Sequence, residues 1–144
     1  TRRVLQDLRA SPLEDLGLAL AVRSLAQSTT ARAGLTLDLH VEEVGSLRPD
    51  IEQTTYRIAQ EALANAANHA DAHHLTVQLG QFDSRLTLTV SDDGRGFDPK
   101  QIATAKRLGV KGMQERADMV GGTLTVESQP GQGTIVMFSV EVQK

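Results

Sequence analysis

The sequence has 144 residues, of which 40% are hydrophobic and 3% aromatic, with a formal net charge of −3 and no cysteine. This length and apolar content predict one domain with a self-sufficient, mostly aliphatic core. The absence of cysteine excludes disulfides, thiolate catalysis and cysteine-based zinc sites. The mild acidity and the lack of stacking aromatic residues argue against nucleic acid as a partner.

The first part of the chain predicts two helices and a strand. Pro12 disfavours helical geometry in the residue before it, so a first helix is expected to end near Arg9. A second helix is predicted over residues 16–33, with Gly34 at its C-terminal cap. Leucine and valine then alternate with polar residues over 35–41, which predicts a strand with one buried face.

The rest of the chain continues as a mixture of helices and strands. The pattern predicts a long helix over 48–70, strands over 75–79 and 86–90, a mobile loop over 98–108, a helix over 110–120, and strands over 124–128 and 134–142. This order predicts an α/β fold, a two-layer sandwich in which helices cover one face of a mixed, mostly antiparallel sheet.

The helix over 48–70 has two different faces. Alanine and leucine fill one side, and the other side carries Arg57, Glu61, Asn65, Asn68 and His69. A polar face is ordinarily a solvated surface, and that interpretation stays open here. Asparagine is, however, a poor helix former, and a carboxylate one turn from a carboxamide supplies the hard oxygen ligands that hold Mg²⁺.

The sequence DDGRG follows the strand over 86–90. As an acidic turn it would need no further explanation, yet glycine lets the backbone approach a ligand, and Asp92 could accept a hydrogen bond from a nucleobase amine. Gly109 and Gly112 lead into the helix predicted from Val110, whose N-terminus would favour phosphate. These features together indicate a nucleotide site.

Other nucleotide and metal motifs are missing from the sequence. There is no GxxxxGK[ST] phosphate loop, no GxGxxG after a first strand, and no HExxH. His73 and His74 are adjacent, and we interpret the pair as an exposed turn rather than a metal site.

Four segments in succession resemble the nucleotide-binding boxes of the histidine-kinase ATPase domain, which is shared in outline with gyrase, Hsp90 and MutL. They read QEALANAANHA, DDGRGF, LGVKGMQERADMVGG and PGQGT. The segments LRASPLEDLGL and GMQERADMVGGTLTVESQPGQGT further resemble the sensor kinases that pair with NarL-type response regulators. The resemblance covers nearly the whole chain and implies the Bergerat-type ATP-binding fold.

The resemblance also implies roles for individual residues. Asn65 would ligate a Mg²⁺ that bridges the phosphates of ATP, and Glu61 would position a metal-bound water or polarise the attacking group. Asp92 would accept a hydrogen bond from the adenine amine, and Gly131 would help to complete the adenine side. The implied cofactor-binding set is Asn65, Asn68, His69, Asp92, Gly94, Gly96, Phe97, Lys106, Gly109, Val110, Gly112, Met113, Gly133 and Thr134.

One position departs from the family pattern, because Asn68 stands where a basic residue is usual. Lys106, Arg107 or Lys111, from the segment that would form or follow the ATP lid (98–108), could supply that charge. They could equally be solvated surface residues.

The resemblance implies ATP and Mg²⁺ as cofactors and, as partners, an upstream dimerisation domain and a NarL-type response regulator. No histidine here is followed by an acidic residue, so the phosphoacceptor is expected outside the chain. Residues 1–10 would end a dimerisation helix and residues 11–144 would form the catalytic and ATP-binding domain. We expect this fragment to be a monomer that binds ATP without phosphorylating itself, whereas the full-length kinase would be a homodimer.

Two alternatives remain at this point. An anti-sigma-type serine kinase of the same fold needs no dimerisation helix, so LRASPLEDLGL argues against it. A non-catalytic module with a decayed site is disfavoured by intact Glu61, Asn65 and Asp92, although Asn68 keeps it open. No apolar run approaches the roughly 20 residues of a membrane span, and no signal peptide opens the chain. A cytoplasmic location is expected, although the full-length kinase could carry a membrane anchor.

Overall fold

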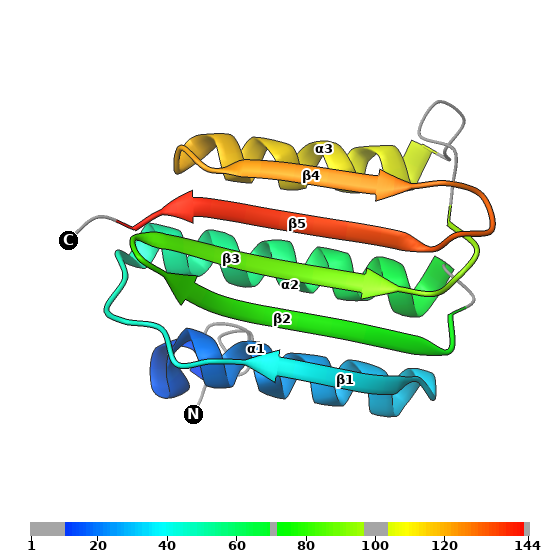
Figure 1. Cartoon of the computed structure of the whole chain (residues 1–144), viewed down its shortest axis with the longest axis horizontal. Coiled ribbons are helices and arrows are strands. Elements are labelled where there is room, and N and C mark those ends of the chain that lie inside the picture. The colour runs from blue at the N-terminus through cyan, green and yellow to red at the C-terminus, as the bar shows by residue number, and fades with distance from the viewer. Residues whose placement is uncertain (1–10, 70–71, 97–103, 143–144) are drawn as a thin grey trace.

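The computed structural model describes residues 11–69, 72–96 and 104–142, with the backbone alone for 11–16, 69 and 104–107 (Figure 1). Within these ranges the elements are α1 (Ser11–Ala33), β1 (Thr36–Val41), α2 (Pro49–His69), β2 (His74–Phe82), β3 (Arg85–Asp92), α3 (Thr104–Met119), β4 (Thr123–Ser128) and β5 (Thr134–Glu141). The predicted order of helices and strands is therefore confirmed.

The strands form one sheet in the order β1-β2-β3-β5-β4. β1 runs parallel to β2, and the other three pairings are antiparallel. Asp92, the last residue of β3, pairs with Leu75 of β2 on one side and with Thr134 of β5 on the other. The end of β3 is thus held at the centre of the sheet.

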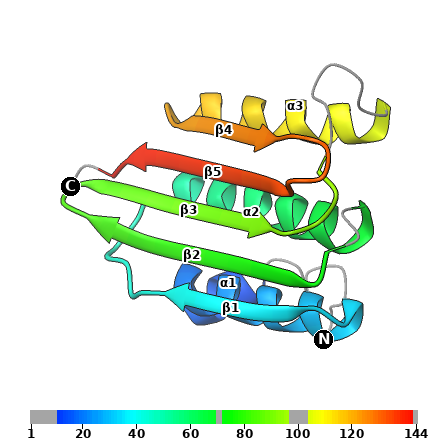
Figure 2. The same cartoon turned by 45° about the vertical axis from the view of Figure 1, so that its right-hand side comes forward.

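All three helices lie on the same face of this sheet (Figures 1 and 2). The core lies between the two layers and is aliphatic apart from Phe138 and Tyr56. Alternate residues of β3 (Leu86, Leu88, Val90) point into it and are at most 3% exposed, as expected for a sheet with one buried face. The predicted two-layer α/β sandwich with a mixed, mostly antiparallel sheet is confirmed.

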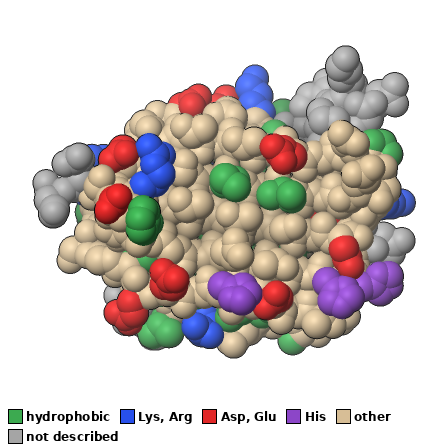
Figure 3. Space-filling view, in the orientation of Figure 1, with side chains coloured by type: hydrophobic (Ala, Val, Ile, Leu, Met, Phe, Trp, Pro, Cys, Tyr) green, Lys and Arg blue, Asp and Glu red, His purple; other side chains and the backbone are tan. Residues whose placement is uncertain are grey.

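The other face of the sheet is uncovered. Figure 3 shows acidic, basic and histidine side chains scattered over this face, with few apolar ones. Its larger apolar side chains are Phe82 at the end of β2, 82% exposed, and Ile135 and Met137 of β5, 39% and 43% exposed. None of the helices in the described part of the chain is both long and apolar enough to cross a membrane.

The first helix begins earlier than its pattern predicts. α1 starts at Ser11 rather than near residue 16, but Gly17 has φ +82° and interrupts its helical geometry. Its end is as predicted, because Gly34 adopts φ +74° and Leu35 N–H bonds the Thr30 carbonyl at 2.9 Å. The helix predicted to end near Arg9 lies outside the described residues.

The predicted start of the third helix was wrong. α3 begins at Thr104 instead of Val110, so residues 104–108, which were predicted to be part of a mobile loop, are helical. Alanine, lysine, arginine and leucine at 105–108 all have high helix propensity, and the two glycines that suggested a helix start lie inside the helix. Its end is as predicted, since Gly121 has φ +74° and Gly122 N–H bonds the Ala117 carbonyl.

Candidate functional site

A small cavity lies between α2, α3 and the C-terminal end of β3. It encloses about 20 Å³ and is lined by Ala62, Asn65, Val90, Asp92, Gly96, Val110, Met113, Val126, Thr134 and Val136. Six of these ten residues belong to the cofactor-binding set that the sequence predicts. A single water needs roughly 10–15 Å³ of such volume, so the cavity has no room for a nucleobase until its walls move.

Asp92 is the acidic group of this cavity. Its side chain is half-buried, and its Oδ1 accepts a hydrogen bond from the backbone N–H of Gly94 at 2.8 Å. This bond fixes the carboxylate at the turn that leaves β3. A partly buried carboxylate among apolar walls is suited to accept a hydrogen bond from an amine on a planar ring.

Two glycines allow the backbone to pack closely around this turn. Gly96 has φ +64°, and a Cβ there would overlap the carbonyl oxygens of Gln129 and Gly133. Gly133 has φ +76°, and a Cβ there would overlap the carbonyl oxygen of Asp92. Both positions combine a left-handed backbone with contact to main-chain atoms, so the loop between β4 and β5 sits directly against the end of β3.

Asn65 and Glu61 lie one turn apart on α2, at two adjoining hollows. Asn65 faces the cavity with Asp92, whereas Glu61 lines an outer groove of about 410 Å³ between α2 and α3. Met113 borders both. Two residues of the polar face predicted for this helix, Asn65 and Glu61, thus face the cavity and the groove next to it.

The groove contains two arginines, Arg57 and Arg116. The sequence places Arg57 on the polar face of its helix without giving it a role, and it does not single out Arg116. The groove is lined by Arg57, Gln60, Glu61, Ala64, Leu108, Gly109, Gly112, Met113 and Arg116. Arg57 donates a hydrogen bond to the Gln60 side chain at 3.2 Å. The groove is therefore lined by one carboxylate and two guanidinium groups, and guanidinium groups are able to contact phosphate oxygens.

Gly109 and Gly112 lie inside α3 rather than before it, which changes what they can do. The phosphate-binding helix start predicted at Val110 is absent from the described backbone there, because α3 begins at Thr104. A Cβ on Gly109 would meet the carboxylate of Glu61, whereas a Cβ on Gly112 would meet nothing within 4 Å. Gly109 therefore gives Glu61 room against the helix.

We expect Gly112→Ala to stabilise the fold and Gly109→Ala to stabilise it less. Alanine in a helix interior is favoured over glycine by about 1 kcal/mol, and at position 112 nothing opposes this gain. At position 109 the new methyl group displaces the Glu61 carboxylate. Urea denaturation measures both free energies of unfolding, and an equal gain in the two variants would contradict the close contact.

Other predicted site residues lie elsewhere or cannot be placed. Asn68 borders a different groove, between α1 and α2, together with Thr29 and Arg32. Its assignment to the cofactor set stays a prediction, although the structure does not bring it to the cavity. Phe97 lies outside the described residues, as do the side chains of His69 and Lys106.

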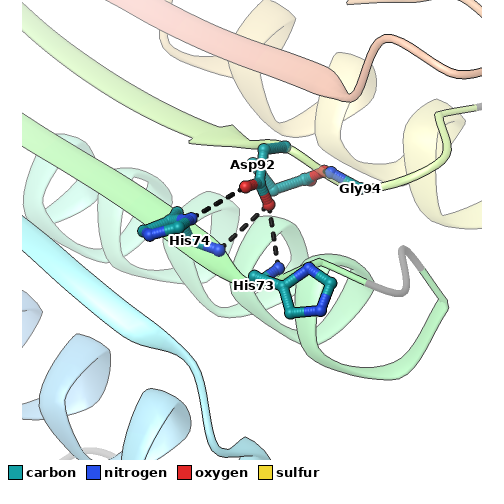
Figure 4. A network of polar contacts seen from close by, with 5 residues as sticks. His73, His74, Asp92 and Gly94 are labelled. Atoms are coloured by element: carbon teal, nitrogen blue, oxygen red, sulfur yellow. Dashed lines mark hydrogen bonds and ion pairs between the residues drawn. The ribbon is translucent and has the colours of Figure 1, made fainter.

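A network of polar contacts ties the start of β2 to the end of β3 (Figure 4). Asp93 Oδ1 accepts the backbone N–H groups of His73 and His74, at 2.8 and 2.9 Å. Asp93 Oδ2 lies 2.9 Å from Nδ1 of His74. These contacts, led by the His74 N–H, hold the pKa of the Asp93 carboxyl well below its usual range, so it stays ionised at neutral and mildly acidic pH.

The sequence contained only part of the information needed to find this site. The apolar walls Val90, Val126 and Val136 read simply as core positions of strands, because an aliphatic side chain that lines a cavity has the same pattern as one that fills it. His73 and His74 were interpreted as an exposed turn. Both residues are indeed exposed, but their backbone N–H groups bind Asp93.

Comparison with known proteins identifies the family. Residues 50–144 match the family described as histidine kinase-, DNA gyrase B- and HSP90-like ATPases. The chain is 30% identical over 142 residues to the signal transduction histidine-protein kinase/phosphatase DegS of Brevibacillus brevis, and 35% identical over 139 residues to DegS of Bacillus subtilis (strain 168). These alignments cover 98% and 92% of this chain but 36% of each relative, so the chain spans about a third of their length.

Solved structures of histidine kinases share the fold. The histidine kinase domain of the Erythrobacter litoralis EL346 blue-light activated histidine kinase superposes with a TM-score of 0.71 at 20% identity, over 87% of this chain and 61% of that one. The mycobacterial sensor histidine kinase MprB gives 0.62 at 18% identity, over 85% and 93%. The resemblance of the four sequence boxes is confirmed: the chain belongs to the histidine kinase-, DNA gyrase B- and HSP90-like ATPase family.

Proposed function

We propose that the chain is the catalytic and ATP-binding part of a sensor histidine kinase. It would donate the γ-phosphoryl group of ATP to a histidine on an upstream dimerisation domain. The observation that carries the proposal is the convergence of Asn65, Asp92 and Thr134, from three separate sequence boxes, on one cavity. Full-length ShkA, which has the same fold with a TM-score of 0.68 at 20% identity, was crystallised in complex with AMPPNP, an ATP analogue.

The residues of the cavity would recognise the base. Asp92 would accept a hydrogen bond from the adenine amine, while Gly96 and Gly133 keep the backbone close enough to bound the ring. Val90 and Val136 provide apolar walls. Phosphoryl transfer relies mainly on positioning and charge neutralisation, which explains why this site combines glycines, an asparagine and carboxylates rather than a strong nucleophile.

Entry of the base would require α3 to move. Val110 and Met113 of α3 close the cavity on one side, and Met113 is only 2% exposed. α3 begins inside the segment, residues 98–108, that the sequence resemblance assigns to the ATP lid. We therefore propose that nucleotide binding displaces these two side chains and exchanges their packing for packing against the base.

Mg²⁺ is the cation that this donor set fits, because an amide oxygen and a carboxylate one helical turn apart are hard ligands. Bound there, it would neutralise charge on the phosphates. Asn65→Ala should then remove most of the Mg²⁺ dependence of ATP-analogue binding, as measured by calorimetric titration. Asn68→Ala is the matched change on the same helix and should leave that dependence intact, since Asn68 faces another groove. If both variants lost the Mg²⁺ dependence equally, both asparagines would contribute to binding the metal and phosphates, and the assignment to Asn65 would be wrong.

The transfer step can be tested on the whole protein that carries this chain. With γ-labelled ATP and Mg²⁺, acid-labile label should appear on histidine. Glu61→Gln should slow labelling by about a hundredfold or more, the usual size of a general acid–base contribution, while nucleotide still binds. Glu52→Gln, on the first turn of the same helix, should have no effect. Labelling of the isolated chain itself would contradict an external acceptor.

We propose a NarL-type response regulator as the downstream partner and a cytoplasmic location. The segment LRASPLEDLGL and the long segment from Gly112 to Thr134 support this group of kinases by resemblance. Phosphotransfer from the labelled kinase to a panel of purified response regulators would test the choice of partner. Preferential transfer to a regulator of another type would overturn it.

A further inference from the structure

Asp93 is exposed, yet its carboxylate makes three polar contacts with the residues at the start of β2. Its carboxylate accepts two backbone N–H groups from the residues that open β2 and also contacts the ring of His74. The Asp93 N–H in turn donates to the carbonyl of His74 at 3.3 Å. One side chain therefore joins the start of β2 to the residue immediately after β3.

Asp92 lies between two contacts that hold the end of β3: the contact of Asp93 with the start of β2, and the contact of Gly133 with the backbone of Asp92. On the β5 side, Gly133 lies so close to Asp92 that a Cβ there would overlap the Asp92 carbonyl oxygen. On the β2 side, the last pair in the ladder is Asp92 with Leu75, and Asp93 extends the connection one residue further. Figure 4 shows His73 and His74 at the start of β2, beside the turn that carries Asp92 and Gly94.

We propose that Asp93 is a positioning residue for nucleotide recognition: by binding the His73 and His74 backbone it fixes the turn that aims the Asp92 carboxylate into the cavity. This inference rests on the proposed function, in which Asp92 binds the adenine amine. Asp93 itself is not one of the residues that line the cavity, so it would act through Asp92.

A second pair of the same residue types shows why the backbone contacts matter. Asp38 and His40 on the edge strand β1 form an exposed contact of 3.0 Å, with 68% and 58% of their side chains exposed. Exposed pairs of this kind contribute little to stability. The Asp93–His74 pair is comparably exposed, but Asp93 also accepts two main-chain N–H groups, and charge-assisted bonds of that kind are stronger and directional.

The test measures how well the protein distinguishes ADP from inosine diphosphate, which lacks the adenine amine. Asp93→Ala should weaken ADP binding by about tenfold, the equivalent of one charge-assisted hydrogen bond, and should reduce the preference for ADP. Asp93→Asn should restore most of both, because its side-chain oxygen still accepts the two N–H groups and its amide can donate to His74 Nδ1 in the other tautomer. Asp38→Ala serves as the matched control and should change neither quantity.

The outcomes separate this inference from the proposed function. Failure of the unmutated chain to bind ADP would count against the proposed function itself. ADP affinity and preference left unchanged by Asp93→Ala in a protein that binds ADP would overturn the role of Asp93 alone. If Asp93→Ala does not fold, Asp93→Glu, which moves the carboxylate by one methylene, takes its place with the same expected drop. An unchanged preference for ADP in that variant would equally overturn the role.

Discussion

Asp92→Ala is expected to weaken ADP binding by about a hundredfold, which corresponds to about 2.7 kcal/mol. A hydrogen bond to a charged group contributes about 1.5–3 kcal/mol, and its removal would leave the adenine amine without a partner in an apolar cavity. The measurement is a calorimetric titration with ADP. Binding at near-normal affinity would show that the base is recognised elsewhere.

Asp92 also accepts the Gly94 N–H, so loss of binding could reflect a disturbed turn instead of a lost base contact. Asp92→Asn separates the two effects. Its side-chain oxygen can still accept the Gly94 N–H, but its amide would present a donor to the donor on adenine. We expect Asp92→Asn to fold normally and to bind ADP as poorly as Asp92→Ala. Recovery of affinity in Asp92→Asn would assign the effect to the turn.

Gly133→Ala is expected to lower the free energy of unfolding by about 2–5 kcal/mol. A non-glycine residue in the left-handed region costs about 1–2 kcal/mol, and overpacking costs about 1–3 kcal/mol more. The overpacking here is against main-chain atoms, since the new Cβ would overlap the Asp92 carbonyl oxygen and approach the Asp93 Cα. For a domain of this size the melting temperature should fall by about 10 °C.

Gly131→Ala measures the backbone contribution alone, so the difference between the two variants gives the contribution of overpacking. Gly131 has φ +80°, close to the φ of +76° at Gly133, but a Cβ there would meet nothing within 4 Å. This variant should therefore lose only the backbone cost of about 1–2 kcal/mol. Thermal unfolding of both variants, followed by circular dichroism, gives the comparison. Equal destabilisation would mean that the loop between β4 and β5 does not press on the end of β3.

The arrangement of helices and strands followed from the sequence because each element has a clear period. α2 has one apolar face, and its observed bounds, Pro49–His69, differ from the predicted ones by one residue at each end. The start of α3 was mistaken because Gly109 and Gly112 suggest a helix terminus. Gly109 instead makes room for the Glu61 carboxylate, a tertiary contact that local propensity does not encode.

The candidate site was predictable as a set of residues but not as a geometry. Sequence boxes selected Asn65, Asp92 and Thr134, and the fold brings all three to one cavity. Asn68 was selected because it shares the polar face of the helix with Asn65 and stands where the family usually has a basic residue, yet in the structure it borders the groove beside α1. The role of Asp93 could not be read from sequence, since its partners are main-chain groups 19 and 20 residues away.

The most direct test of a nucleotide site in this cavity is calorimetric titration of the unmutated chain with ADP and with a non-hydrolysable ATP analogue, each with and without Mg²⁺. We expect saturable binding of one nucleotide per chain, strengthened by Mg²⁺ for the triphosphate analogue. No saturable binding of either nucleotide under any of these conditions would contradict the assignment of this cavity as an ATP site.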